Sequence, residues 1–94
     1  MSESVFGLEG LRKTDGVILL DVRSEEEYKK RHLEGAVNIP LDVLEEKADE
    51  IITDHSAVIA AYCSSGARSI EAVIILREIG FENAYCLGGV VLDA

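Results

Sequence analysis

The residues best suited to chemistry lie in one short loop that begins with a cysteine and ends with an arginine. The loop, Cys63-Ser64-Ser65-Gly66-Ala67-Arg68, follows the apolar run Ala57–Tyr62. Its small residues allow successive backbone N–H groups to turn toward one point, where they bind an anion or a thiolate. A thiolate held in this way has a lowered pKa and is nucleophilic at neutral pH. The loop therefore favours a nucleophilic Cys63 over the buried, inert cysteine that usually follows an apolar strand.

The length of the loop separates two kinds of chemistry. Four residues lie between Cys63 and Arg68, whereas phosphatases that use a cysteine have a longer spacing that makes room for a phosphate group. The narrower ring suits a single sulfur atom attached to the cysteine. The spacing thus favours persulfide chemistry, and a cysteine phosphatase or an arsenate reductase is the less favoured alternative.

The elements that must position this loop alternate between strand and helix signals. Such alternation is typical of βαβ units with a mostly parallel sheet. We expect an α/β fold in one domain spanning residues 1–94, with about five strands flanked by helices on both faces. Expected strands lie near Ser4–Val5 and at Val17–Leu20, Gly35–Pro40, Ala57–Tyr62 and Ala84–Leu87. Expected helices begin at Ser24, Asp42 and Ala67.

Helix starts and helix faces can also be predicted. Ser24 followed by Glu27, and Asp42 followed by Glu45, are both typical of capping boxes. The second helix should have one apolar face, formed by Leu44, Ala48, Ile51 and Ile52. The helix over residues 67–79 has more apolar residues than one stripe requires, so it is either deeply packed or partly covered by a partner, such as a second copy of the chain.

Composition excludes several classes of function. The chain has 94 residues and a formal net charge of -9, which disfavours nucleic acid and anionic membrane surfaces as partners. The sequence has no apolar run long enough to span a bilayer, and Met1–Ser4 shows no signal-peptide features. Two cysteines in such a chain indicate a reducing, cytoplasmic location. The cysteines and histidines show no zinc-ligand spacing, so we expect no metal.

Three ordered segments carry a family resemblance. Asp21–Tyr28 contains an Asp-x-Arg sequence followed by a glutamate and an aromatic residue, and His32–Pro40 reads His-Leu-Glu-Gly-Ala-Val-Asn-Ile-Pro. The third segment, Cys63–Ser69, contains the Cys-x-x-Gly-x-Arg-Ser pattern. Together with Gly80-Phe81 and Gly88-Gly89, these segments resemble the single-domain rhodanese family.

The resemblance implies a sulfurtransferase that carries sulfur as a persulfide on Cys63 and needs no other cofactor. Thiosulfate or another sulfane-sulfur compound would load the cysteine, and cyanide, a thiol or a sulfur-relay protein would remove the sulfur. Backbone N–H groups of Ser64, Ser65, Gly66, Ala67 and Arg68 would bind the sulfur. A non-catalytic interaction or sensing module is the alternative, and retention of the cysteine weighs against it.

The resemblance also implies supporting roles for Asp21, Arg23 and His32. We expect ion pairs between Asp21 and Arg68 and between Arg23 and Glu27, and we expect His32 to orient a loop. Asn38 should bind backbone groups near a strand end, and His55 should be a solvated loop residue. Cys86 lies within a strand, where burial as a small hydrophobe is the default, and a role as a resolving cysteine is disfavoured.

Several departures from the family pattern bear on function. Arg31 stands where the family usually has glycine, and two serines follow Cys63 where many thiosulfate-using members have a basic residue. Asp93 lies about where the family has a tryptophan, and the usual final helix is absent, so we expect a shortened C-terminus. The missing basic residue weakens the case for thiosulfate as the preferred donor.

Overall fold

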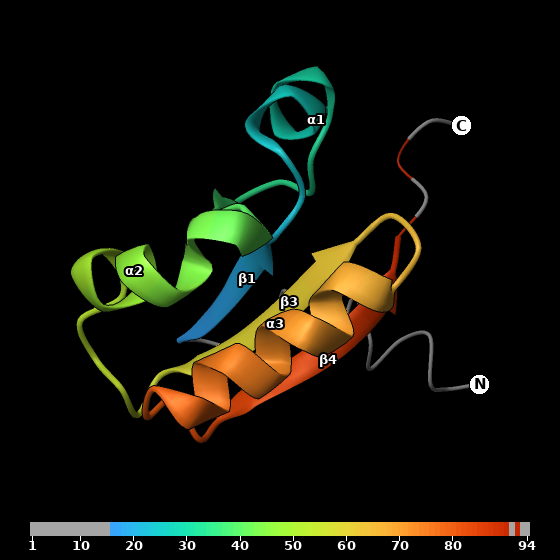
Figure 1. Ribbon diagram of the computed structural model, residues 1–94. Coiled ribbons are helices and arrows are strands. Elements are labelled where there is room, and N and C mark those ends of the chain that lie inside the picture. The colour runs from blue at the N-terminus through green and yellow to red at the C-terminus, as the bar shows by residue number, and fades with distance from the viewer. Residues whose placement is uncertain (1–15, 91, 93–94) are drawn as a thin grey trace.

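The computed structural model describes residues 16–90 and 92, which form a parallel α/β sheet structure (Figure 1). The strands are β1 (Val17–Asp21), β2 (Val37–Asn38), β3 (Val58–Cys63) and β4 (Ala84–Gly89). They lie in the order β2-β1-β3-β4, and every neighbouring pair is parallel. These four match four of the five expected strands, and the fifth, near Ser4–Val5, lies outside the described residues.

The helices cover the sheet because each places apolar side chains against it. α2 (Leu41–Ile51) and α3 (Ala67–Glu78) pack on one face, where Leu44, Leu76 and Ile59 belong to one buried cluster. α1 (Glu25–Lys30) supplies Tyr28 to a second cluster on the other side. That cluster is completed by Leu19, Leu33, Ala36, Ala60 and Tyr62, with Val17, Leu87, Val90 and Leu92 packed against it.

One of the two predicted capping boxes is confirmed. The Ser24 hydroxyl accepts a hydrogen bond from the Glu27 backbone N–H, and the Glu27 carboxylate accepts one from the Ser24 backbone N–H, which fixes the start of α1. The box at Asp42 is wrong, because α2 begins one residue earlier, after Pro40, and has no side-chain cap. Asp42 instead lies in the first turn, where its negative charge complements the helix dipole.

The apolar faces of the two longer helices are narrower than predicted. In α2, Leu44 and Ala48 are buried, but Ile51 is half exposed and Ile52, just beyond the helix, is buried instead. In α3, Leu76 is fully buried, whereas Ile70 and Ile74 are 56% and 54% exposed. In the part of the chain that the structure describes, no helix is both long and apolar enough to cross a membrane.

Candidate active site

The polar residues singled out from the sequence gather at one edge of the sheet. In a parallel sheet all carboxyl ends meet at the same edge, and ligands of open α/β sheets bind there. Asp21 ends β1, Asn38 ends β2 and Cys63 ends β3. β3 is central and buried along most of its length, so the position of Cys63 is fixed by the core.

Cys63 Sγ lies against the first turn of α3. It accepts hydrogen bonds from the backbone N–H groups of Gly66, at 2.9 Å, and Ser69, at 3.4 Å, and the Ser69 hydroxyl lies 3.6 Å away. Burial by itself raises the pKa of the Cys63 thiol, but the hydrogen bonds from Ser69, Gly66 and Arg68 outweigh it and the net pKa is lowered. The arrangement stabilises a thiolate, as an activated cysteine requires.

The shape of the loop depends on two glycines. Gly66 has a φ of 97°, a left-handed conformation that residues with a Cβ resist, and this turn brings its N–H to the sulfur. Gly89 of β4 lies directly beneath the loop, since a Cβ there would be 2.7 Å from the Ser64 carbonyl oxygen. The end of β4 therefore supports the loop and has no room for a side chain.

Arg68 does not pair with Asp21, so that expectation is wrong. Its guanidinium donates hydrogen bonds to both carboxylate oxygens of Glu27, at 2.8 and 3.2 Å, and lies 3.5 Å from the Ser64 hydroxyl. This hydrogen bond is the main reason why the pKa of Glu27 is lowered to about 2. The charge of Arg68 is thus neutralised by a carboxylate that follows β1 in the chain.

The expected ion pair between Arg23 and Glu27 is also wrong, because Arg23 pairs with Asp21 instead. The Asp21 carboxylate is fully buried and accepts hydrogen bonds from the Arg23 side chain, the shortest at 2.8 Å, and from the Tyr62 hydroxyl at 2.8 Å. The Tyr62 hydroxyl accepts a hydrogen bond from the Leu33 N–H. Burial is the main cause that raises the pKa of Tyr62, so its hydroxyl stays protonated and donates to Asp21. Arg23 also donates to the Arg31 carbonyl, and the pair holds the segment after α1 against the sheet.

His32 and Asn38 both bind backbone groups. His32 Nδ1 lies 2.8 Å from the Tyr28 carbonyl oxygen, and its ring stacks on the Tyr28 ring at 3.8 Å, consistent with the loop-orienting role. The Asn38 amide donates to the carbonyls of Asp21 and Arg23, at 2.9 and 3.0 Å. His55 is exposed, as expected of a solvated loop residue, but it also contacts Asp49 and stacks on Phe81.

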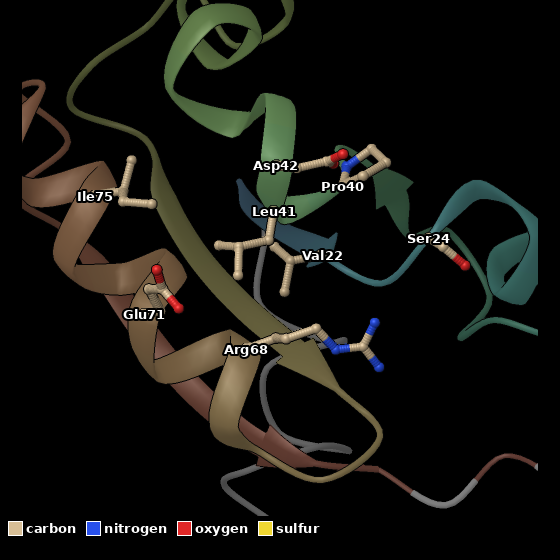
Figure 2. A pocket seen from close by; sticks show the side chains of 8 residues that line it. All are labelled: Val22, Ser24, Pro40, Leu41, Asp42, Arg68, Glu71 and Ile75. Carbon is tan, nitrogen blue, oxygen red and sulfur yellow. The ribbon is translucent and has the colours of Figure 1, made fainter.

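A groove of about 470 Å³ runs beside the loop, between α3 and the start of α2 (Figure 2). Val22, Leu41 and Ile75 give it an apolar wall. The carboxylates of Asp42 and Glu71 are its acidic groups, and Arg68 reaches from the groove to the first turn of α1. Ser24 and Pro40 complete its lining.

Two residues behave differently from what the sequence predicted. Ser69 was not singled out as a site residue, although it contacts Cys63 through both its N–H and its hydroxyl. Ser69 could have been recognised from the sequence, because it is the last residue of the Cys-x-x-Gly-x-Arg-Ser pattern and lies in the first turn of the helix that faces the cysteine. Cys86 was expected to be buried and is exposed, since it lies on β4 at the edge of the described sheet.

The side chains of Ser64, Ser65 and Ala67 are exposed, so these residues would act on a bound sulfur through their backbone groups. Among the described residues no three His, Cys, Asp or Glu side chains lie close enough to hold a metal ion.

Comparison with known proteins decides the family of this site. The family model of the rhodanese-like domain matches residues 7–91 of this chain. The chain belongs to the rhodanese-like domain family. The resemblance seen in the sequence is confirmed, and so is the α/β fold with a parallel sheet.

Individual rhodanese-like relatives agree with this assignment. Thiosulfate sulfurtransferase PspE of Escherichia coli is 36% identical over 70 residues, which cover 74% of this chain and 67% of PspE. A tRNA sulfurtransferase of Pyrobaculum aerophilum is 38% identical over 73 residues, but the chain spans only 14% of it. The human single-domain sulfurtransferase TSTD1 superposes with a TM-score of 0.76 at 27% identity, covering 89% of this chain and 85% of TSTD1.

Proposed function

We propose that this rhodanese-like domain is a sulfurtransferase that carries sulfane sulfur as a persulfide on Cys63. The observation that supports the proposal best is the pair of backbone N–H groups, from Gly66 and Ser69, that point at Cys63 Sγ. These donors stabilise the negative sulfur that attacks and is later expelled. Sulfurtransferase names among the relatives support the same reaction class.

In the first half-reaction the Cys63 thiolate attacks the outer sulfur of thiosulfate. A Cys63–sulfur bond forms, the sulfur–sulfur bond of thiosulfate breaks, and sulfite leaves with the electron pair. In the second half-reaction cyanide or a thiolate attacks the outer sulfur of the persulfide and Cys63 leaves as a thiolate. The lowered pKa of Cys63 helps both steps, because it increases the share of the nucleophilic thiolate and makes the cysteine a better leaving group.

The charges around the loop bear on the choice of donor. Arg68 is the loop's cation, and Glu27 neutralises it at 2.8 Å. Asp42 and Glu71 add negative charge in the neighbouring groove. A dianionic donor such as thiosulfate therefore meets little net positive charge, and a neutral or less charged sulfane-sulfur compound is equally well suited to load Cys63.

The experiment is to incubate the protein with thiosulfate, and separately with inorganic polysulfide, and to measure the intact mass. We expect the mass of one added sulfur atom, lost on addition of cyanide with release of thiocyanate. Cys63→Ser should abolish the adduct, whereas Cys86→Ser, the matched control, should retain it. An adduct that persists in Cys63→Ser contradicts the assignment, and hydrolysis of a phosphate ester without any sulfur adduct would favour the phosphatase alternative.

A further inference from the structure

The two cysteines of the chain are joined by a single hydroxyl group. Ser69 Oγ lies 3.6 Å from Cys63 Sγ and 3.2 Å from Cys86 Sγ, so both sulfur atoms contact the same oxygen atom. Their accessibility is opposite, because Cys63 is fully buried and Cys86 is exposed. A persulfide on Cys63 would thus form at a buried position, and only the Ser69 side chain would separate it from the exposed Cys86 thiol.

The strand register argues against a direct disulfide between the two cysteines. Cys86 pairs with Ala61, whereas Cys63, two residues further along β3, pairs with Gly89. With strands about 4.8 Å apart and a rise of about 3.3 Å per residue, the two Cα atoms are on the order of 8 Å apart, beyond the roughly 7 Å that a disulfide spans. A persulfide differs, because its sulfur–sulfur bond extends Cys63 by about 2 Å.

We propose that Cys86 accepts the sulfur atom from the Cys63 persulfide, so that sulfur loaded at the buried cysteine is presented at the exposed one. This step rests on the proposed function. The Cys86 thiolate, having lost its proton to solvent, attacks the outer sulfur of the persulfide. A bond forms between Cys86 Sγ and that sulfur, and the bond to Cys63 Sγ breaks with its electron pair remaining on Cys63. The sulfur keeps its oxidation state, so no oxidant or reductant is needed.

The surroundings of Cys63 favour transfer in this direction. The leaving group is Cys63, whose thiolate is received by the N–H groups of Gly66 and Ser69. Ser69 Oγ contacts both sulfur atoms and also donates to the Gly66 carbonyl oxygen at 2.9 Å. Because a hydroxyl rotates about its C–O bond, Ser69 can donate a hydrogen bond to whichever of the two sulfur atoms is a thiolate.

The test locates the sulfur within the full chain. The protein is loaded with thiosulfate, alkylated with iodoacetamide and cleaved with trypsin, which cuts after Lys47, Arg68 and Arg77 and so separates Cys63 from Cys86. Mass spectrometry should show the extra sulfur on both peptides 48–68 and 78–94 of the unaltered protein. Cys63→Ser should lose it from 78–94, because Cys86 is loaded only through Cys63, and Cys86→Ser should keep it on 48–68.

Each other outcome overturns the inference in a distinguishable way. Sulfur that stays on 48–68 alone in the unaltered protein overturns the transfer and leaves the proposed function intact. Sulfur on 78–94 of Cys63→Ser shows that Cys86 is loaded directly. If loaded Cys86→Ser passes sulfur to added Cys63→Ser as fast as the label reaches Cys86 in the unaltered protein, the transfer is between molecules. Absence of sulfur from both peptides in every protein overturns the proposed function together with this step.

Discussion

Glu27 and Arg68 are joined by two hydrogen bonds, of 2.8 and 3.2 Å, which connect the start of α1 to the start of α3. Both side chains are about one third exposed, so the pair lies at the surface of the site. Because Arg68 closes the Cys63 loop, this carboxylate sets the charge that an anionic sulfur donor encounters.

Glu27→Gln should improve the use of thiosulfate. Glutamine keeps the capping box with Ser24 but removes the negative charge, so Arg68 becomes available to the dianion. We expect KM for thiosulfate to fall by roughly fivefold, which corresponds to about 1 kcal/mol for one charge near the surface. Glu26→Gln removes the same charge at an exposed position one residue away and serves as the control. An unchanged KM in Glu27→Gln would show that Arg68 does not take part in binding the donor.

The rate of Cys63 alkylation should report its lowered pKa. Because the folded protein favours the thiolate, the rate against pH should have its midpoint below that of an ordinary cysteine. Ser69→Ala removes the side-chain hydrogen bond, the largest of the contributions that lower this pKa, so the midpoint should move to higher pH.

The experiment measures iodoacetamide incorporation on peptide 48–68, with Ser65→Ala as the control, since the Ser65 side chain is exposed and its backbone N–H is retained. Equal midpoints in the unaltered protein and Ser69→Ala would rule out the hydroxyl as a source of the shift.

Gly89→Ala should disrupt the loop more than the fold. The new Cβ would lie 2.7 Å from the Ser64 carbonyl oxygen, so the loop must move away from β4. Overpacking of this kind costs about 1–3 kcal/mol, and we expect sulfur loading to fall well beyond what partial unfolding explains.

Gly35→Ala is the comparison for this variant. Gly35 has a φ of 84° but open space around it, so alanine there introduces backbone strain alone. Chemical denaturation and loading rates should show that Gly35→Ala loses stability but keeps its loading rate. A normal loading rate in folded Gly89→Ala would contradict the supporting role of β4.

Two substitutions on α3 should separate its packed face from its exposed face. Leu76 is fully buried, so Leu76→Ala should lower the free energy of unfolding by about 2–5 kcal/mol. Ile74 is 54% exposed, so Ile74→Ala should change it by no more than about 0.5 kcal/mol. Urea denaturation measures both. A large loss for Ile74→Ala that grows with protein concentration would indicate that a second copy covers this face.

The sequence predicted those parts of the fold that depend on local patterns. The apolar run before Cys63 became the central strand β3, and Ser24 with Glu27 formed the cap of α1 because both signals act within a few residues. The cap at Asp42 failed because α2 already begins at Leu41, directly after Pro40, which places Asp42 inside the first turn.

The failures at the site concern contacts between distant segments. The pairing of arginines with carboxylates depends on where α1 lies relative to α3. Local sequence patterns do not give the distance between these two helices. Asp21 pairs with Arg23, two residues away, whereas Glu27 pairs with Arg68, which is 41 residues away. The exposure of Cys86 was missed for a related reason, since a strand's place in the sheet order decides how much of it is covered.

The buried group formed by Asp21, Arg23 and Tyr62 has a consequence for how this domain can change over evolutionary time. Asp21 is fully buried, Arg23 nearly so, and each member satisfies the polar atoms of another. Loss of one partner strands a buried charge and costs roughly 3–5 kcal/mol, a large share of the stability of a small domain. A single substitution of either charged residue is therefore strongly destabilising. The group can be replaced only when its charged members are exchanged for apolar residues at the same time.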